Sequence, residues 1–317
     1  MAWRANYTEV VNGLIDSRVP QGWHRKIYLN AALGDDSAVN DGADPNTPIA
    51  SLTEADNFLR AGYNDAIILQ PSTSSISLAA SYTWSKNMCG LIGNSPEAFM
   101  NQRARIGMST TFTPMITVSG YGNLFANLYT MHGTAVGDLV GWLISGHRNS
   151  FQNVHFGGPM EAAQGGASGY IGVHVTGTEN YFKNCTLGTS TIGRDEVTPN
   201  VKLGPGTRTV FENCIFQCYL TDGDPVFITA DNSSGTTEAW FKNCQFIALN
   251  ANWATAMTVA LTATAGGSTC GLYFDNNCQF VNVTATCAND VDQFVWLPRQ
   301  FTTTTDTEGM RSVQLSI

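Results

Sequence analysis

Charged side chains suited to acid–base chemistry occur in the second half of this 317-residue chain. They are Glu161, Arg194, Asp195, Glu196, Asp222 and Asp224. Hydrolysis of a glycosidic bond needs two carboxyl groups at a fixed separation, and a lyase-type elimination needs carboxylates that hold calcium together with a basic side chain. Only Asp195 and Asp222, 27 residues apart, fall near matching positions of adjacent repeats. The sequence therefore predicts solvated loop charges and assigns no catalytic residue.

The five histidines are His24, His132, His147, His155 and His174, and they share no spacing typical of a zinc site. His155 lies between two apolar residues in a strand-like segment, so its side chain is predicted to point outward. No Gly-x-Ser-x-Gly, phosphate-loop or Cys-x-x-Cys motif occurs. The sequence implies no cofactor, and its histidines indicate no zinc site.

Four aspartates cluster near the N-terminus, at Asp35, Asp36, Asp41 and Asp44. Their spacing matches part of a calcium-binding loop, but the full loop and its bidentate Glu at the twelfth position are missing. Two interpretations stay open. The pattern favours a turn-rich loop that closes one end of the fold, and a cation site is the alternative.

A short phrase occurs six times along the chain and indicates the fold class. Most copies place a Phe two residues before an Asn and a small apolar residue directly after it. The asparagines are Asn127, Asn153, Asn184, Asn213, Asn243 and Asn277. The intervals between them are 26, 31, 29, 30 and 34 residues. Such a drifting period is typical of a solenoid whose repeats carry loops of variable length.

The Asn of each copy is predicted to bend the chain. In a continuous strand Phe241 and Cys244 would lie on opposite faces, although both are apolar. Asn adopts the left-handed conformation more readily than most residues, so one such Asn can turn the strand. Stacked copies then form a ladder of hydrogen-bonded amides beside a file of inward-facing side chains. That file comprises Leu128, Val154, Cys185, Cys214, Cys244 and Cys278.

This pattern resembles the right-handed parallel β-helix of the pectate-lyase-like superfamily, and the resemblance supplies the handedness. We predict an all-β chain of about seven turns, the earliest near Asn94, which lies 33 residues before Asn127. Gly146-His147-Arg148 is similar to the Gly-His-Gly of polygalacturonases. However, Arg148 replaces the second glycine, and the paired Asp motif upstream is missing.

Composition narrows the possible partners. With 43% hydrophobic residues, 13% charged residues and 31 Gly, the chain suits short strands and turns. Its net charge of −9 argues against binding to DNA or RNA. Four of the eight cysteines recur at one repeat position, so we predict buried thiols rather than disulfides. No apolar run has the length of a signal peptide or a membrane span, so we expect synthesis in a cytoplasm and no membrane partner.

The chain is predicted to divide into four segments. Residues 1–26 form an N-terminal arm, and residues 27–66 form a capping strand, loop and helix. The helix is predicted to cover residues 49–59, with Gly62 as its stop signal. Residues 67–287 form the parallel β-helix, and residues 288–317 form C-terminal strands.

Apolar side chains in the two terminal segments are candidates for binding a partner. They are Trp3, Val10, Val11 and Trp23 in the arm, and Phe294 and Trp296 near the C-terminus. The arm carries more apolar surface than a disordered tail usually does. For the C-terminal strand two interpretations stay open, namely that it caps the last turn or that it pairs with a symmetry mate.

A β-helix with apolar arms and no recognisable catalytic pattern resembles the capsid decoration, or cement, proteins and the short tailspikes of tailed bacteriophages. The resemblance implies a non-enzymatic virion protein, a homotrimer that stabilises a phage head by binding across subunits of the major capsid protein or another virion protein. The alternative is a tailspike-like protein that binds or degrades polysaccharide, with a groove formed by loops 157–168, 189–199 and 219–225. A bacterial surface adhesin is disfavoured because the chain shows no export signal.

Overall fold

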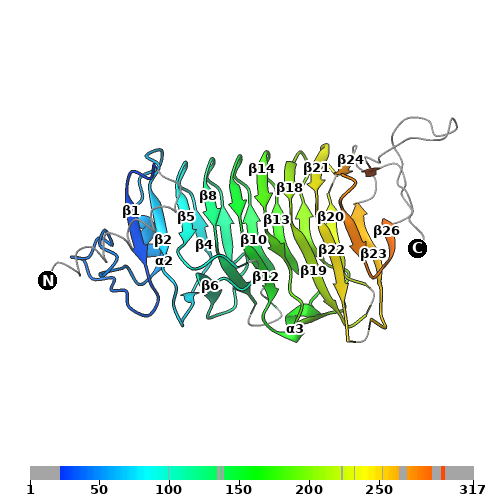
Figure 1. The fold of residues 1–317 in the computed structure, drawn as a ribbon, viewed down its shortest axis with the longest axis horizontal. Helices are drawn as coiled ribbons and strands as arrows, with labels where there is room; N and C mark the ends of the chain where they lie inside the picture. Colours follow the sequence, from blue (N-terminus) through cyan, green and yellow to red (C-terminus); the bar gives the residue numbers. More distant parts are fainter. Residues whose placement is uncertain are drawn as a thin grey trace.

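The chain winds into one elongated coil whose strands form three long parallel sheets (Figure 1). The computed structural model describes residues 22–98, 100–133, 137, 139–222, 224–231, 233–251, 253–263, 270–287 and 294–296. The predictions for Trp3, Val10 and Val11 lie outside the described residues. Among the described residues, no helix reaches the length and apolarity needed to cross a bilayer.

Each sheet runs the length of the coil. Sheet A contains, in order, β1 (Lys26–Leu29), β2 (Ala66–Leu69), β5 (Gly90–Gly93), β8 (Leu124–Ala126), β11 (Ser150–Gln152), β14 (Asn180–Lys183), β18 (Arg208–Glu212), β21 (Thr237–Lys242), β24 (Cys270–Phe274) and β27 (Phe294–Trp296). Sheet B contains β3 (Ile76–Leu78), β6 (Arg105–Met108), β9 (Tyr129–His132), β12 (His155–Pro159), β15 (Thr186–Leu187), β19 (Ile215–Leu220), β22 (Gln245–Leu249) and β25 (Gln279–Val281), with β16 (Gly193–Arg194) also paired to β19. Sheet C contains β4 (Tyr82–Trp84), β7 (Ile116–Val118), β10 (Val140–Ile144), β13 (Ile171–Val175), β17 (Pro199–Leu203), β20 (Val226–Ala230), β23 (Met257–Ala263) and β26 (Val283–Cys287).

Each turn of the coil passes through sheets A, B and C in that order, and equivalent residues of successive turns lie side by side. Phe182 of β14, for example, pairs in register with Phe151 on one side and Phe211 on the other. The prediction of an all-β parallel β-helix of about seven turns is confirmed. Sequence repeats thus become spatial columns, because each copy lies directly on the previous one.

The repeated phenylalanines form a continuous column of stacked rings inside the coil. Its members are Phe125, Phe151, Phe182, Phe211, Phe241 and Phe274, and none is more than 1% exposed. Successive ring centroids lie 5.0, 4.7, 4.7, 5.1 and 4.6 Å apart. A second column, Phe216, Phe246 and Phe280, has spacings of 4.5 and 4.4 Å. Stacked aromatic pairs add roughly 0.5–1.5 kcal/mol beyond the burial of their area, so these columns stabilise the coil along its axis.

A short helix lies at the N-terminal end of the coil, next to β1. Helix α2 (Leu52–Asn57) begins at Ser51, whose side-chain oxygen accepts a hydrogen bond from the backbone N–H of Glu54 at 3.2 Å. Leu52 and Ala55 face the core and are buried. The helix is shorter than the predicted 49–59 and ends five residues before Gly62, which instead occupies a later turn at φ 82°.

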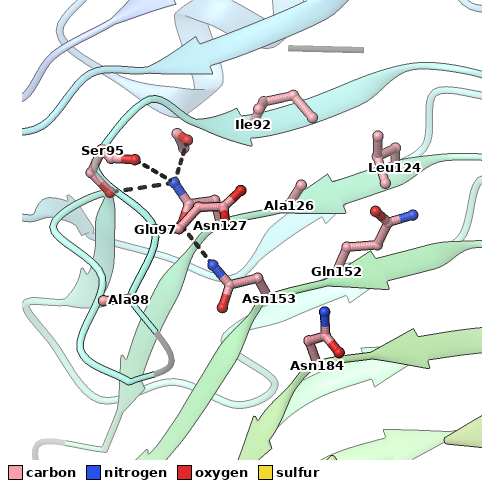
Figure 2. A pocket seen from close by; sticks show the side chains of 11 residues that line it. Ile92, Ser95, Glu97, Ala98, Leu124, Ala126, Asn127, Gln152, Asn153 and Asn184 are labelled. Carbon is pink, nitrogen blue, oxygen red and sulfur yellow. Dashed lines mark hydrogen bonds between the residues drawn. The ribbon is translucent and has the colours of Figure 1, made fainter. Parts of the chain in front are cut away.

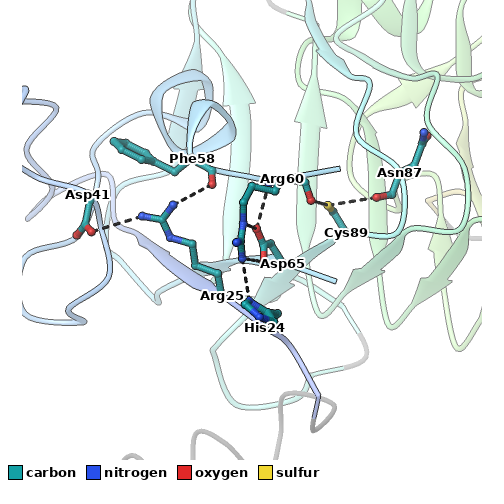
Figure 3. A network of polar contacts seen from close by, with 8 residues as sticks. All are labelled: His24, Arg25, Asp41, Phe58, Arg60, Asp65, Asn87 and Cys89. Carbon is teal, nitrogen blue, oxygen red and sulfur yellow. Dashed lines mark hydrogen bonds and ion pairs between the residues drawn. The ribbon is translucent and has the colours of Figure 1, made fainter. Parts of the chain in front are cut away.

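A polar network joins this end to the first strands (Figure 3). The guanidinium of Arg60 binds the fully buried carboxylate of Asp65 through two hydrogen bonds of 2.9 Å, and its backbone N–H donates a third at 3.1 Å. Burial raises the pKa of Asp65, but the hydrogen bonds and charge of Arg60 outweigh it, so the pKa is lowered overall. Arg25 contacts Asp41 at 3.4 Å and the carbonyl of Phe58 at 3.3 Å. The network therefore binds the capping loop and the helix end to the coil.

At the other end, the last described strand continues the coil of its own chain. Strand β27 pairs in parallel with β24, with Phe294 opposite Leu272 and Trp296 opposite Phe274. Of the two interpretations of this strand, the structure therefore favours the cap on the last turn. The side chains of Phe294 and Trp296 lie outside the described residues.

Candidate functional site

Five of the six repeated asparagines make the bend between sheets A and B. Asn127, Asn153, Asn184, Asn213 and Asn243 have φ values of 51–55°. The backbone N–H groups of the first four each donate to a carbonyl of the next turn at 2.9 Å. Left-handed backbone is costly for most side chains and less so for Asn, which explains the choice of residue.

The asparagine side chains form two hydrogen-bonded runs with an interruption between them. The side-chain amide of Asn153 donates to Asn127 at 2.9 Å, that of Asn213 to Asn184 at 3.3 Å, and that of Asn243 to Asn213 at 2.9 Å. In the part of the chain that the structure describes, the amide nitrogen of Asn184 donates no such bond to Asn153. The ladder therefore leaves one amide donor available at its centre.

The prediction that Asn277 is the sixth member of the ladder is wrong. The last copy holds one extra residue between Phe274 and Cys278, and Asn277 is exposed in a turn rather than at positive φ. Asp275 takes over part of the role, because its carboxylate accepts the backbone N–H groups of Asn243 and Asn277, both at 3.0 Å. The corner closes there without a left-handed Asn.

The inward file beside the ladder is apolar and closely packed. Leu128, Val154, Cys185, Cys214 and Cys244 are fully buried, and Cys278 is 8% exposed. The four thiols lie 3.3–3.5 Å from carbonyl oxygens of the preceding turn. Burial raises the pKa of Cys214 well above its usual range, so this thiol stays protonated and unreactive. None of the eight cysteines, which all lie among the described residues, forms a disulfide, and the four at the repeat position are buried, as predicted.

A groove lined by both polar and apolar side chains lies along this corner, next to the break in the ladder (Figure 2). We call it the corner groove; it has a volume of about 470 Å³. The asparagine column forms its middle, loop 95–98 lies on one side, and outward side chains of sheet A lie on the other. Its main lining side chains are Ile92, Glu97, Leu124, Gln152, Asn153 and Asn184.

The loop that bounds the corner groove is fixed to the coil by two side chains. The amide of Gln102 donates to the backbone and side-chain oxygens of Asn153 at 2.9 and 3.2 Å. The backbone N–H of Asn101 donates to Nδ1 of His155 at 3.1 Å. These bonds hold the wall in place before any ligand arrives.

His155 points away from the core, as predicted, but its ring is not exposed to solvent. The ring does leave the core side of β12, but loop 101–104 covers it, so only 3% of the residue is exposed. It stacks on Tyr129 with 4.7 Å between ring centroids, and its Nε2 lies 3.1 Å from the carbonyl of Gly188. Burial lowers the pKa of His155 to about 4, although the Gly188 carbonyl opposes this shift, so the ring is neutral at pH 7.

Outward residues of sheet A form a second surface feature, which we call the aromatic strip. It consists of Tyr181, Val210, Trp240 and Tyr273, which pair in register on four successive strands. All four are half-buried, and the rings of Trp240 and Tyr273 stack at 5.2 Å. The strip occupies the position directly before the repeated Phe, so the aligned repeats carry a signal for it in the sequence.

Charged residues border the aromatic strip on both sides. On one side Glu212 accepts a hydrogen bond from the Tyr181 hydroxyl at 2.8 Å and forms an ion pair with Lys183 at 3.3 Å. Lys242 lies opposite Glu212 on the next strand. Burial and Glu212 together raise the pKa of Tyr181 to about 12. On the other side Arg208 pairs with Glu179. The surface thus has an apolar centre and a charged rim.

The outer face of sheet C is polar by comparison. Its column is Thr83, Thr117, Leu143, His174, Lys202, Thr229 and Thr262. Lys202 pairs with Asp231 at 3.4 Å, so its charge is balanced. Burial, and then the charge of Lys202, lower the pKa of His174, which makes it a neutral proton acceptor at pH 7.

The charged residues first considered for catalysis do not converge. Asp195, Glu196, Asp224 and Glu161 are exposed, in agreement with solvated loop charges. Asp222 accepts the backbone N–H of Asp224 at 3.0 Å, a turn contact. His147 accepts the N–H of Thr178 at 2.9 Å, and Arg148 pairs with Glu179, so both stabilise turns.

Arg194 is the exception, because it is 1% exposed rather than solvated. Its guanidinium lies 4.6 Å from the ring centroid of Tyr170 and donates to Asn200 and to the hydroxyl of Thr198, the latter at 2.7 Å. Pairing of β16 with β19 folds this segment back onto the coil. Arg194 therefore supports the loops between sheets B and C.

The aspartates near the N-terminus bind backbone groups of their own loop. Asp36 accepts the N–H groups of Ala50 and Ser51 at 2.7 and 3.1 Å, and Asp41 accepts that of Ala43 at 3.0 Å. Across the described ranges, no cluster of three or more His, Cys, Asp or Glu side chains is placed to hold a metal ion. These contacts are those of a turn-rich capping loop.

Trp23 was predicted to bind a partner, but its ring packs on its own sheet A. A Cβ atom at Gly90 would lie 2.5 Å from this ring, and the ring also contacts the apolar cluster of Tyr28, Ile68 and Ile92. The absence of a side chain at Gly90 makes room for it. Trp23 thus covers the N-terminal part of the sheet that carries the aromatic strip further along.

Two of the solved structures that this chain resembles are a pectate lyase and a pectin methylesterase. Pectate lyase Pel9A matches with a TM-score of 0.54 and 15% identity over 80% of this chain and 69% of that chain. Pectin methylesterase PemA from Erwinia chrysanthemi matches with a TM-score of 0.42 and 11% identity over 82% of this chain and 81% of that chain. No family model and no curated protein matches the sequence. The chain therefore has the pectate-lyase-like, right-handed parallel β-helix fold, and at this identity the likeness concerns the fold alone.

Proposed function

We propose that this chain is a non-enzymatic structural protein that binds a protein surface through the aromatic strip. The observation that carries the proposal is the arrangement of Tyr181, Val210, Trp240 and Tyr273 in one line across sheet A, between two charged margins. Protein interfaces have the same anatomy, with Tyr and Trp at a desolvated centre and polar groups at the rim.

The geometry of the rings favours a protein over a sugar at this surface. Sugars bind aromatic residues by lying against the flat face of a ring. In the strip, Trp240 and Tyr273 cover one another's faces at an interplanar angle of 14°, and Val210 occupies the other side of Trp240. The edges that remain, together with alternating Lys183, Glu212 and Lys242, suit a protein surface of mixed charge.

The partner we propose is the shell of a virus particle. The resemblance to phage decoration proteins suggests the major capsid protein or another virion protein as the partner, the virion as the location, and a homotrimer as the functional form. A coil held rigid by stacked columns can span a joint between two capsid subunits and stabilise the shell through buried area. The strip, in this proposal, faces the capsid rather than a second copy of the chain.

Binding to particles that lack this chain tests the proposal. Purified chain is mixed with such particles, and co-sedimentation and the temperature of particle disruption are measured. We expect saturable binding and a higher disruption temperature. Trp240→Ala should weaken binding by about tenfold or more, the usual effect of losing an interface tryptophan. Full binding by this variant, or conversion of a trimer to monomers, would contradict the assignment of the strip to the capsid.

A second candidate function is binding of polysaccharide, as in a tailspike. The expected groove among loops 157–168, 189–199 and 219–225 has fewer supporting features, since Arg194 is buried there against Tyr170. The observation that favours this candidate lies at a different corner of the coil, in the corner groove. Release of reducing sugar or unsaturated uronate from a glycan would show an enzymatic activity and would overturn the non-enzymatic proposal.

A further inference from the structure

The corner groove is a preformed hollow that neither the ladder nor the aromatic strip explains. Its volume of about 470 Å³ is that of a small-ligand site, and Gln102 and His155 hold its outer wall in place. The groove lies where the asparagine ladder is interrupted. The amide of Asn184 therefore faces the groove with its nitrogen available, instead of being bonded to the next turn.

We propose that the corner groove binds a neutral, polyhydroxylated glycan chain lying along the coil axis. Amide groups both donate and accept, as sugar hydroxyls do, and the groove presents the exposed amide of Gln152 and the available amide nitrogen of Asn184, beside Asn153, which already bonds Asn127 and Gln102. The carboxylate of Glu97 adds two acceptors. Ile92 and Leu124 supply apolar contact for the C–H groups of a sugar ring.

The charge of the lining selects against acidic ligands. Glu97 is the ionisable residue among the lining side chains, and no Lys, Arg or His accompanies it. A uronate or phosphate placed beside Glu97 would meet a like charge without a balancing cation. A neutral glycan meets no such penalty.

Further along the same corner, a second hollow suits the continuation of a chain. It has a volume of about 320 Å³ and is lined by Asn213, Asn243 and Gln245, again with amides. Each turn of the coil repeats at about 4.8 Å, so amide groups recur along the axis at regular intervals. A polymer of repeating hydroxyl groups matches that regularity. An extended peptide matches it less well, because the corner presents side-chain amides rather than an unpaired strand edge.

Direct titration tests this proposal. The intact chain is titrated with cellohexaose, xylohexaose and mannohexaose as neutral probes, with hexagalacturonate as the acidic probe, and with a neutral Gly/Ser hexapeptide. We expect at least one neutral hexasaccharide to bind, and hexagalacturonate and the peptide not to bind. Absence of binding by all three neutral probes, or equal binding of hexagalacturonate or the peptide, overturns the proposal.

Two groove variants and one control locate the site. Gln152→Ala removes an exposed amide, and Asn184→Gly removes the available amide while keeping a residue that tolerates positive φ. Each should weaken binding of the neutral probe by about tenfold, as expected for the loss of one or two good hydrogen bonds. Asn57→Ala removes an exposed amide on α2, away from both hollows, and should bind as the natural chain does. Unchanged binding by Gln152→Ala, which alters no buried group, overturns the assignment. None of these residues belongs to the aromatic strip. A negative result in the glycan test therefore leaves the particle-binding proposal standing, and the reverse also holds.

Discussion

The two faces of sheet A contrast more sharply than any other regions of the molecule. In β21, Phe241 points inward and continues a column of Phe, whereas Trp240, its neighbour in sequence, points outward in a column that also contains Leu, Ser, Tyr and Val. The inner face repeats because each turn must stack on an identical one. The outer face is free of that constraint, so its aromatic strip and corner groove carry the information about partners.

If the inner column supports the coil, then its truncation should produce the largest loss of stability. Phe211→Ala removes a fully buried ring that stacks on Phe182 and Phe241. We expect a loss of about 3–5 kcal/mol in the free energy of unfolding. Urea denaturation monitored by circular dichroism measures it, and a loss below about 1 kcal/mol would show that the column does not support the coil.

His155 of β12 is an exception to the contrast between inner and outer residues. It points away from the core and is nevertheless buried. Its pKa is about 4 in the folded chain against about 6.5 when unfolded. The unfolded chain therefore binds the proton first as the pH falls from about 6.5 to 4, and stability decreases over that window by about 3 kcal/mol. The unfolding free energy of the natural chain and of His155→Gln is compared at pH 7 and pH 4. A variant that keeps the full pH dependence would exclude His155 as its source.

The corner between sheets A and B offers a matched pair of asparagines. Asn213→Leu places a branched side chain at φ 53° and removes a ladder bond to Asn184, so we expect a loss of about 2–3 kcal/mol. Asn277→Leu makes the same change in an exposed turn and should alter stability by less than about 0.5 kcal/mol. Thermal unfolding of both variants measures the two losses of stability. Equal losses would mean that the left-handed corner has no special role.

Of the two ring truncations, the one on the outer face is expected to have the smaller effect on stability. Trp240→Ala removes a half-buried ring whose inner neighbours stay in place, so the free energy of unfolding should fall by about 1 kcal/mol or less. The same denaturation experiment as for Phe211→Ala provides the measurement. A loss as large as that of Phe211→Ala would make Trp240 a structural residue and remove the contrast.

The fold could be predicted from the sequence because its rules are local and repeated. The conformation of Asn and the two-residue alternation of strands were enough to place Phe241 and Cys244 on one interior. The same rules failed at Asn277, where a single extra residue changed the turn chemistry. At the early turn, Gly93 rather than Asn94 stands opposite Asn127, since Ile92 pairs with Ala126.

The surface features could not be predicted in the same way, because they depend on how loops fold back. His155 becomes buried only when loop 101–104 covers it, and Arg194 only when β16 pairs with β19. The corner groove requires loop 95–98 to stand beside a column built from distant turns. The aromatic strip is different, since aligned repeats already show Tyr181, Trp240 and Tyr273 at one position.

Oxidative footprinting of the chain on virus particles tests the central proposal most directly. Hydroxyl radicals are applied to the free and the particle-bound chain, and the oxidation of each aromatic residue is measured by mass spectrometry. The proposal predicts that Trp240 and Tyr273 become protected on binding, while Tyr121 and Trp253, which are 49% and 55% exposed and lie outside the strip, stay reactive. Protection of Tyr121 or Trp253 with Trp240 and Tyr273 unchanged would contradict it.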